Sequence, residues 1–147
     1  EACAKKRIGA LIVFEQEIGL KDFIENGVQL NSSITSELLS TVFMPFTPLH
    51  DGAVIIQGQK IAAASCFLPT TSNHSEVAKE LGSRHRAAIG ITELTDALVF
   101  VVSEETGQIS KAKSGKLTRG LTMDRVQKLV AAAFTRVNRG RRLFSRK

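Results

Sequence analysis

Short apolar runs separated by polar turns are the feature that most constrains how this chain can fold. The runs occupy residues 9–14 (GALIVF), 53–56 (AVII), 61–67 (IAAASCF) and 97–102 (ALVFVV). Runs of roughly four to eight apolar residues between turn signals predict buried strands. A membrane span needs roughly 18 apolar residues, and no stretch of the chain approaches that length. We therefore expect a folded domain built around a sheet.

Helical periodicity occurs in the segments between these runs. It predicts helices over residues 18–27, 33–43, 75–82, 84–94 and 122–138. The helix over 75–82 is expected because Asn73 and Glu76 resemble a capping box. In the last segment, apolar side chains recur at helical spacing over three turns, at Val126, Leu129, Val130, Ala133, Phe134 and Val137. Such a stripe predicts a helix packed against the sheet.

Tight turns connect several of the expected strands. Gly58 permits a hairpin between residues 53–56 and 61–67, and two further strands are expected over 108–112 and 116–119. Strands and helices are interspersed, and no linker or repeat interrupts the 147 residues. The sequence therefore predicts one α/β domain, with a central mixed, largely antiparallel sheet flanked by helices and a core over about 8–138.

Much of the formal charge of +6 comes from the C-terminus. Residues 138–147 (NRGRRLFSRK) carry five cations and no acid, and the rest of the chain is nearly balanced. Such a segment can bind nucleic acid or an anionic membrane surface, but a solvated tail over 139–147 is the simpler interpretation. The chain has eight Phe but no Tyr or Trp, which argues against a surface that stacks single-stranded bases. We therefore expect no nucleic-acid partner.

The cysteines and histidines limit the kind of metal site that the sequence allows. Cys66 lies in an apolar run, where a thiol behaves as a small core residue, and nothing suggests a disulfide framework. His50, His85, Asp51 and Glu105 lack the close spacing of a structural zinc site. A hard divalent cation such as Mg²⁺ or Mn²⁺, held by few protein ligands together with phosphates, fits these residues better.

The first polar motif is PLHDGAVII, over residues 48–56. It places His50 and Asp51 at the mouth of an expected strand, and Gly52 lets a ligand approach the backbone closely. Asp51 is suited to bind a metal or to accept a proton from an attacking hydroxyl. The same residues also form an ordinary Asp-Gly turn, which is a very common pattern. Taken alone, this motif favours the turn over a site.

The second motif is GSRHRAAIG, over residues 82–90. Gly82 is expected to close one helix and Ser83 to be the N-cap of the next. Arg84 and Arg86 then lie in a first turn, where acidic residues are favoured by the helix dipole. Helix N–H groups and guanidinium groups together bind anions, whereas the alternative is that the arginines pair with acids elsewhere in the fold. The broken local preference favours an anion site.

The third motif is VVSEETG, over residues 101–107. Ser103, Glu104 and Glu105 follow the most apolar strand, and strand ends are frequent places for ligand sites. A glutamate here can bind a metal, but EETG is equally an ordinary acidic turn. The chain contains neither a P-loop nor a G-x-G-x-x-G motif. A nucleoside triphosphate would therefore need cations, N–H donors and a divalent metal instead.

Taken together and in this order, the three motifs resemble the diadenylate cyclase (DAC) domain family. The hallmarks of that family are an Asp-Gly-Ala motif, here Asp51-Gly52-Ala53, and an Arg-His-Arg motif, here Arg84-His85-Arg86. The resemblance extends through GALIVFE, KELGSRHRAAIGITE and VVSEETGQIS, and it covers roughly residues 8–119. It is greatest to the membrane-associated bacterial branch, in which transmembrane helices precede the cyclase domain. Where the family often has Thr before Arg-His-Arg, this chain has Ser83, which keeps the hydroxyl.

The resemblance implies an enzyme that joins two ATP molecules into cyclic di-AMP and releases two pyrophosphates. Each ribose 3′-hydroxyl would attack the α-phosphate of the other ATP. The implied catalytic residues are Asp51, Gly52 and Arg84, and the implied ligands of Mg²⁺ or Mn²⁺ are His50, Asp51 and Glu105. The residues implied to contact ATP are Gly52, Ala53, Phe67, Leu68, Ser83, Arg84, His85, Arg86, Ser103 and Glu104, with His85 and Arg86 in a supporting shell.

The resemblance also implies partners and a location. Family members place one ATP on each of two protomers, so catalysis would need a face-to-face homodimer. The domain is expected in the cytoplasm, held at the membrane by a segment outside this sequence and regulated by other proteins. Two rival functions are a nucleotide-binding module without catalysis and a basic nucleic-acid-binding domain. Asp51 and Glu105 favour an enzyme over the first, and the near-neutral charge outside the C-terminus opposes the second.

Overall fold

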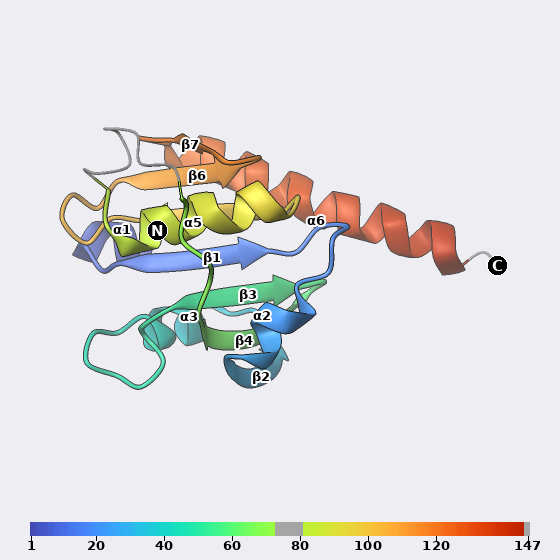
Figure 1. The fold of residues 1–147 in the computed structure, drawn as a ribbon, viewed down its shortest axis with the longest axis horizontal. Coiled ribbons are helices and arrows are strands. Elements are labelled where there is room, and N and C mark those ends of the chain that lie inside the picture. Colours follow the sequence, from blue (N-terminus) through green and yellow to red (C-terminus); the bar gives the residue numbers. More distant parts are fainter. Residues whose placement is uncertain (73–80, 146–147) are drawn as a thin grey trace.

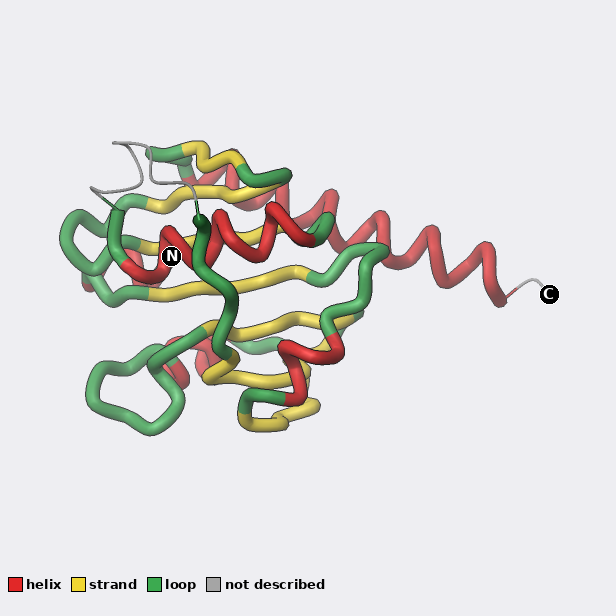
Figure 2. The backbone as a smooth tube through the Cα atoms, viewed as in Figure 1, coloured by secondary structure: helices red, strands yellow, loops and turns green. Residues whose placement is uncertain are grey.

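One sheet with helices on both faces forms the centre of the molecule (Figures 1 and 2). The structure is a computed structural model and describes residues 1–72 and 81–145, with side chains described as far as residue 136. The helix expected over 75–82 falls outside these residues, apart from its last two positions. Within the described chain, no helix combines the length and the apolar character that crossing a bilayer requires.

The sheet has seven strands in the order β2-β4-β3-β1-β5-β6-β7. Only β1 and β3 run parallel, and the other neighbouring strands are antiparallel, which confirms the expected mixed, largely antiparallel sheet. The strand bounds are β1 Ala10–Phe14, β2 Val28–Ser33, β3 Ala53–Gln57, β4 Lys60–Cys66, β5 Leu98–Val102, β6 Ile109–Lys113 and β7 Lys116–Thr118.

Two small elements were not expected from the sequence. The helix α1 (Ala2–Lys6) precedes β1, and the strand β2 occupies residues that carry little strand signal. Because β2 extends to Ser33, the expected start of a helix at that residue is wrong. The helices are α1, α2 Lys21–Glu25, α3 Ser36–Val42, α5 Ser83–Leu94 and α6 Met123–Ser145.

The helix α6 continues past its expected end at residue 138. Its backbone is helical to Ser145, so most of the basic segment over 139–147 extends the helix and is not a separate tail. The physical reason is that arginine and leucine are good helix formers. A single interior glycine, Gly140, costs only about 1 kcal/mol and does not end a helix that is otherwise favourable.

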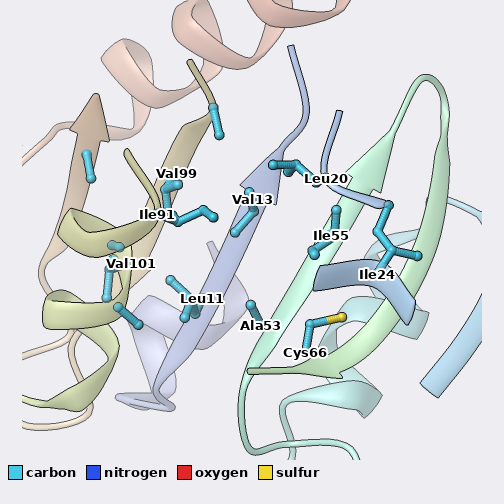
Figure 3. Packing of buried hydrophobic residues seen from close by; sticks show 14 of the residues in the cluster. Leu11, Val13, Leu20, Ile24, Ala53, Ile55, Cys66, Ile91, Val99 and Val101 are labelled. Carbon is cyan, nitrogen blue, oxygen red and sulfur yellow. The ribbon is translucent and has the colours of Figure 1, made fainter. Parts of the chain in front are cut away.

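Apolar side chains are buried on both faces of the sheet. On one face, β1, β3 and β5 pack beneath α2 and α5, and Figure 3 shows Ile91 of α5 beside Val99 and Val13, and Ile24 of α2 beside Ile55. On the other face, α1, α3 and α6 cover the sheet. Burial on both faces explains why the central strands are continuous apolar runs with no polar alternation.

Aromatic rings fix α6 to the second face. The ring of Phe14 lies 5.9 Å from that of Phe100 and 5.7 Å from that of Phe134, both edge to face. Edge-to-face pairs of this kind add about 1 kcal/mol beyond the area that they bury. The predicted apolar stripe of α6 is therefore confirmed where its side chains are described, with Ala133 buried.

The strand directions bring three distant segments to one end of the sheet. Because β1 and β3 are parallel and β5 is antiparallel to both, β1 and β3 begin where β5 ends. The register confirms this arrangement, since Ile12 pairs with Val54 and Ala10 pairs with Val102. We call this the motif end of the sheet. The opposite end, where β1 stops at Phe14, is called the far end.

Candidate active site

All three sequence motifs lie at the motif end. Asp51 and Gly52 directly precede β3, and the loop over 103–107 directly follows β5, with β1 between the two strands. Neighbouring strands are about 4.8 Å apart, so the two segments are separated by about 10 Å. The first turn of α5 opens at the same end, over β1 and β5 (Figure 1).

A hollow of about 100 Å³ separates the start of α5 from the loop after β5. Pockets that enclose whole drug-sized ligands measure roughly 300–1,000 Å³, so this hollow has room for only part of a nucleotide. Six of the predicted site residues line it: Ser83, Arg84, His85, Ser103, Glu104 and Glu105. Arg119 lines it too, and sequence reasoning missed this residue because it lies beyond the last motif.

The helix α5 begins without a side-chain cap. Its N-cap is Gly82, in an extended conformation, and Ser83 is the first helical residue, so the prediction that Ser83 is the N-cap is wrong. The first N–H groups of a helix have no intrahelical acceptor, and no acidic residue lies in this first turn. Uncapped N–H groups beside a hollow are suited to bind an anion.

Arg84 is the most strongly constrained cation at this site. Its side chain is only 19% exposed, and its Nη1 lies 3.5 Å from Oε2 of Glu104. Its Nε is buried and has no hydrogen-bond partner among the described atoms. An unsatisfied buried donor costs about 1–3 kcal/mol, whereas the ion pair is weak because the Glu104 side chain is 70% exposed. The arginine therefore pairs weakly with an acid of the same site, and its buried Nε is left without a partner.

His85 is half-buried beside this arginine. Burial is the main cause that lowers its pKa below the ordinary value of 6.5, and the positive charges of Arg119 and Arg84 lower it further. Glu105 acts in the opposite direction but more weakly. The imidazole is therefore neutral at pH 7, which leaves the positive charge of the hollow to the arginines.

The loop after β5 is held by its own serine. The Ser103 hydroxyl accepts the N–H groups of Glu105 at 3.2 Å and Thr106 at 3.3 Å. The Gly107 N–H donates to the Ser103 carbonyl at 2.9 Å. These bonds shape the turn and leave the carboxylates of Glu104 and Glu105 exposed. The hydroxyl hydrogen of Ser103 remains available as a donor to a ligand.

The His-Asp-Gly segment shows one feature of a turn and one feature of a site. Gly52 has φ +88°, and a Cβ at this position would lie 2.8 Å from the Cys66 carbonyl oxygen. The glycine is thus required by backbone packing, and the close approach expected from a ligand is made by the next strand. By contrast, His50 Nδ1 lies 2.6 Å from the Thr47 carbonyl, so its Nε2 faces away from that bond. Metal-binding histidines are commonly oriented in this way.

An exposed aromatic residue follows the strand that lies beside Gly52. Phe67 comes directly after β4, whose Cys66 pairs with Ala53, and Phe67 is 62% exposed. Asn26 holds the Phe67 backbone at both groups, since its Oδ1 accepts the N–H and its Nδ2 donates to the carbonyl, each at 3.1 Å. Asn26 was not predicted, and nothing in its local sequence marks it. Leu68 follows as a partly buried residue packed on the core.

The predicted metal ligands do not form a ready-made cage. Among the side chains that the structure describes, over 1–72 and 81–136, no three His, Cys, Asp or Glu residues gather into a metal-binding group. His50 and Asp51 lie on one side of β1, and Glu105 lies on the other. An imidazole nitrogen and carboxylate oxygens nevertheless fit a divalent ion that takes most of its ligands from phosphates and water.

These observations define a class of protein, namely a single α/β domain in which an uncapped helix start faces carboxylates at one end of a mixed sheet. Residues 1–117 match the family described as DisA bacterial checkpoint controller nucleotide-binding, abbreviated DAC. The chain belongs to this family, and the resemblance seen in its motifs is confirmed.

Two curated relatives are about half identical to this chain over the residues that align. Cyclic di-AMP synthase CdaA of Bacillus subtilis is 52% identical over 136 residues, which are 92% of this chain and 50% of that protein. A diadenylate cyclase of Listeria monocytogenes is 52% identical over 127 residues, covering 86% of this chain and 46% of the relative. The chain thus spans about half the length of the curated relatives that it matches.

Solved structures confirm the fold. DacA from Staphylococcus aureus, solved as an N166C/T172C double mutant, has a TM-score of 0.87 and 53% identity, covering 90% of this chain and 88% of that one. A protein from Bacillus cereus described as a hypothetical membrane spanning protein has a TM-score of 0.78 and 45% identity, covering 82% and 59%.

Proposed function

We propose that this chain is the catalytic domain of a diadenylate cyclase, which condenses two ATP molecules into cyclic di-AMP and releases two pyrophosphates. The observation that carries the proposal is the position of Arg84. This residue is partly buried at an uncapped helix start and faces exposed carboxylates at the sheet end that also carries Asp51. Membership of the DAC family, with relatives described as cyclic di-AMP synthases, supports this reaction.

The phosphates bind at the start of α5. The first N–H groups of the helix, the Ser83 hydroxyl and the Arg84 guanidinium converge on the hollow, whose small volume suits phosphate groups and not a whole nucleotide. Ser103 adds a hydroxyl donor from the opposite wall. Glu104 currently pairs with Arg84, so that contact opens when a phosphate takes its place.

The adenosine lies beside Gly52 and Ala53, against the exposed ring of Phe67 and its neighbour Leu68. An aromatic face offers stacking to a base, and the clamp from Asn26 fixes the backbone that carries it. His85 and Arg86 act from a supporting position in α5, and the neutral imidazole avoids adding further positive charge.

Asp51 orients and deprotonates the attacking 3′-hydroxyl. Its carboxylate is exposed and accepts a hydrogen bond from the adjacent Gly52 N–H at 3.1 Å, which leaves acceptor positions for a hydroxyl. The 3′-oxygen attacks the α-phosphorus of the second ATP, and pyrophosphate leaves. Because each ATP must meet another, two protomers bring their motif ends together as a homodimer.

The proposed reaction also uses a divalent cation, Mg²⁺ or Mn²⁺. His50 through Nε2 and Glu105 through its carboxylate would hold it, with Asp51 beside them. When bound, the ion neutralises phosphate charge and polarises the reacting oxygen. Every protein ligand named here is a hard donor or an imidazole, as such ions prefer.

In the full-length protein, the domain works in the cytoplasm, tethered to the membrane by a segment outside this sequence. The description of the Bacillus cereus structure as membrane spanning supports this arrangement. Regulatory proteins are further expected partners of the tethered enzyme.

The test is direct. The purified chain is incubated with ATP and either Mn²⁺ or Mg²⁺, and cyclic di-AMP and pyrophosphate are separated by chromatography. We expect product whose yield per protomer rises with protein concentration, because the reaction needs two protomers. Arg84→Ala serves as the inactive control. Absence of product with both metals over a wide range of protein concentration would refute the proposed function.

A further inference from the structure

The residue before β1, Gly9, lies directly against the guanidinium of Arg84. A Cβ at position 9 would be 2.5 Å from Nη1, 2.7 Å from Cζ and 3.1 Å from Nε of that side chain. Nonbonded carbon contacts are normally about 3.5–4.0 Å. The guanidinium therefore occupies space that exists only because position 9 has no side chain.

The constraint at Gly9 differs from that at other crowded glycines. A Cβ at Gly52 or Gly90 would meet a backbone carbonyl, that of Cys66 or Pro69, which cannot move without disturbing the fold. Gly9 is not among the residues with positive φ, so its backbone does not itself require glycine. The nearest atoms to a Cβ at Gly9 all belong to the flexible end of one side chain, which can move aside.

We propose that Gly9 is a positioning residue. The space beside it lets the Arg84 guanidinium lie where it can hold the ATP phosphates. Arginine is a long side chain that loses much rotamer freedom when it is fixed, and the bare backbone at the start of β1 gives it a defined surface to lie on. In this position, Nε of Arg84 is buried and its Nη1 lies near Glu104 across the hollow. This inference rests on the proposed function, because it assigns Gly9 to the phosphate site.

The substitution Gly9→Ala separates positioning from folding. To restore a normal contact, the guanidinium must move by about 1 Å, and a displacement of this size can reduce activity by up to about a hundredfold. We expect the KM for ATP to rise at least about tenfold, the loss typical of a weakened charged hydrogen bond. The melting temperature should stay close to that of the wild type. Gly19→Ala is the matched control, since a Cβ there meets nothing within 4 Å.

A double-mutant cycle identifies the contact that is responsible. In an Arg84→Ala background the guanidinium is absent, so Gly9→Ala should cause no further change in ATP binding. Binding is measured by calorimetric titration with 3′-deoxy-ATP, which lacks the attacking hydroxyl and cannot be cyclised. Equal effects of Gly9→Ala in the two backgrounds would overturn the proposal, and so would unchanged binding in the single variant.

The outcomes distinguish this inference from the proposed function. If the wild type makes no cyclic di-AMP, the proposed function fails. Titration with 3′-deoxy-ATP still tests whether Gly9 positions Arg84 for phosphate binding. If Gly9→Ala lowers the melting temperature strongly, the melting temperature of the Gly9→Ala/Arg84→Ala double variant shows whether contact with the guanidinium is the cause. Recovery of stability without the guanidinium supports the contact, and persistent instability shows that other atoms crowd position 9 and overturns the proposal.

Discussion

The two ends of the sheet carry the same kinds of acidic side chain but satisfy them differently. At the far end, the Asp96 carboxylate accepts the N–H groups of Glu17 and Ile18, each at 3.0 Å. Glu15 accepts the Leu20 N–H at 2.9 Å. These acids hold the loop after β1 in place, so their carboxylates are used for hydrogen bonds within the fold.

At the motif end, the acids keep most of that capacity. Among the described residues, the Glu104 carboxylate makes one ion pair, a 3.5 Å contact with Arg84. Within the part of the chain that the structure describes, Glu105 makes no side-chain hydrogen bond or ion pair, and Asp51 accepts one bond from its own neighbour, Gly52. The comparison teaches that the number of acids does not mark a site. The acids at the motif end face water and keep carboxylate oxygens that a ligand can use.

The largest expected effect comes from Asp51→Asn. Removing the proposed base should lower the rate of cyclic di-AMP formation by about 10²–10⁴-fold, with little change in melting temperature because the carboxylate supports no loop. The rate is measured by chromatography at saturating ATP. The equivalent exchange at the far end, Asp96→Asn, should leave the rate per folded molecule unchanged. Full activity of Asp51→Asn would remove the assigned role.

A smaller effect is expected for Glu105→Gln. If this carboxylate binds the divalent ion, the Mn²⁺ concentration needed for half-maximal activity should rise by at least about tenfold. The measurement is a metal titration of activity at fixed ATP. Glu17→Gln, an exposed glutamate at the far end, is the control and should titrate like the wild type. An unchanged metal requirement in Glu105→Gln would show that the ion binds elsewhere.

At the far end, substitution should change stability and leave catalysis unaffected. Asp96→Ala removes both acceptors of the Glu17 and Ile18 N–H groups and should lower the free energy of unfolding by about 1–3 kcal/mol. Urea denaturation measures this change. Glu17→Ala keeps its backbone N–H and should cost much less. If Asp96→Ala were as stable as the wild type but inactive, the division between the two ends would be wrong.

The smallest expected effect is a pH dependence from His85. Because burial lowers its pKa below 6.5, the unfolded chain binds a proton more readily than the folded chain does. Its contribution is therefore fully present above pH 6.5, and stability is lost as the pH falls below that value. The loss between pH 7.5 and pH 5.5, measured by urea denaturation, should be smaller in His85→Gln. An equal loss in both proteins would assign the effect to other groups.

The sequence predicted the elements that burial dictates and missed those that pairing dictates. The central strands were predictable because they are continuous apolar runs, buried on both faces. The strand β2 (VQLNSS) was not, because it lies at the sheet edge with a broken register between Gln29 and Ser32. Its strand conformation comes from the backbone of β4, which no local pattern reveals.

The site was predictable in its motifs but not in its arrangement. Ser83, Arg84 and Glu104 were named from sequence, yet only the strand order places them around one hollow. Gly9 and Arg119 were missed. For Gly9, the one signal in the sequence is a glycine directly before an apolar run. This pattern does not show that the Arg84 side chain fills the space beside the glycine.

The motif end forms only when the central strand β1 pairs with strands that are distant in the sequence. The two neighbours of β1, namely β3 and β5, come from distant parts of the chain, with Ile12 beside Val54 and Ala10 beside Val102. Non-local pairings of this kind slow folding, because long loops must close before any contact is gained. On the ribosome, the hollow has no second wall until the residues after Val102 have emerged. A nascent or truncated chain that lacks them already contains Asp51 and Arg84, but it has no site in which to use them.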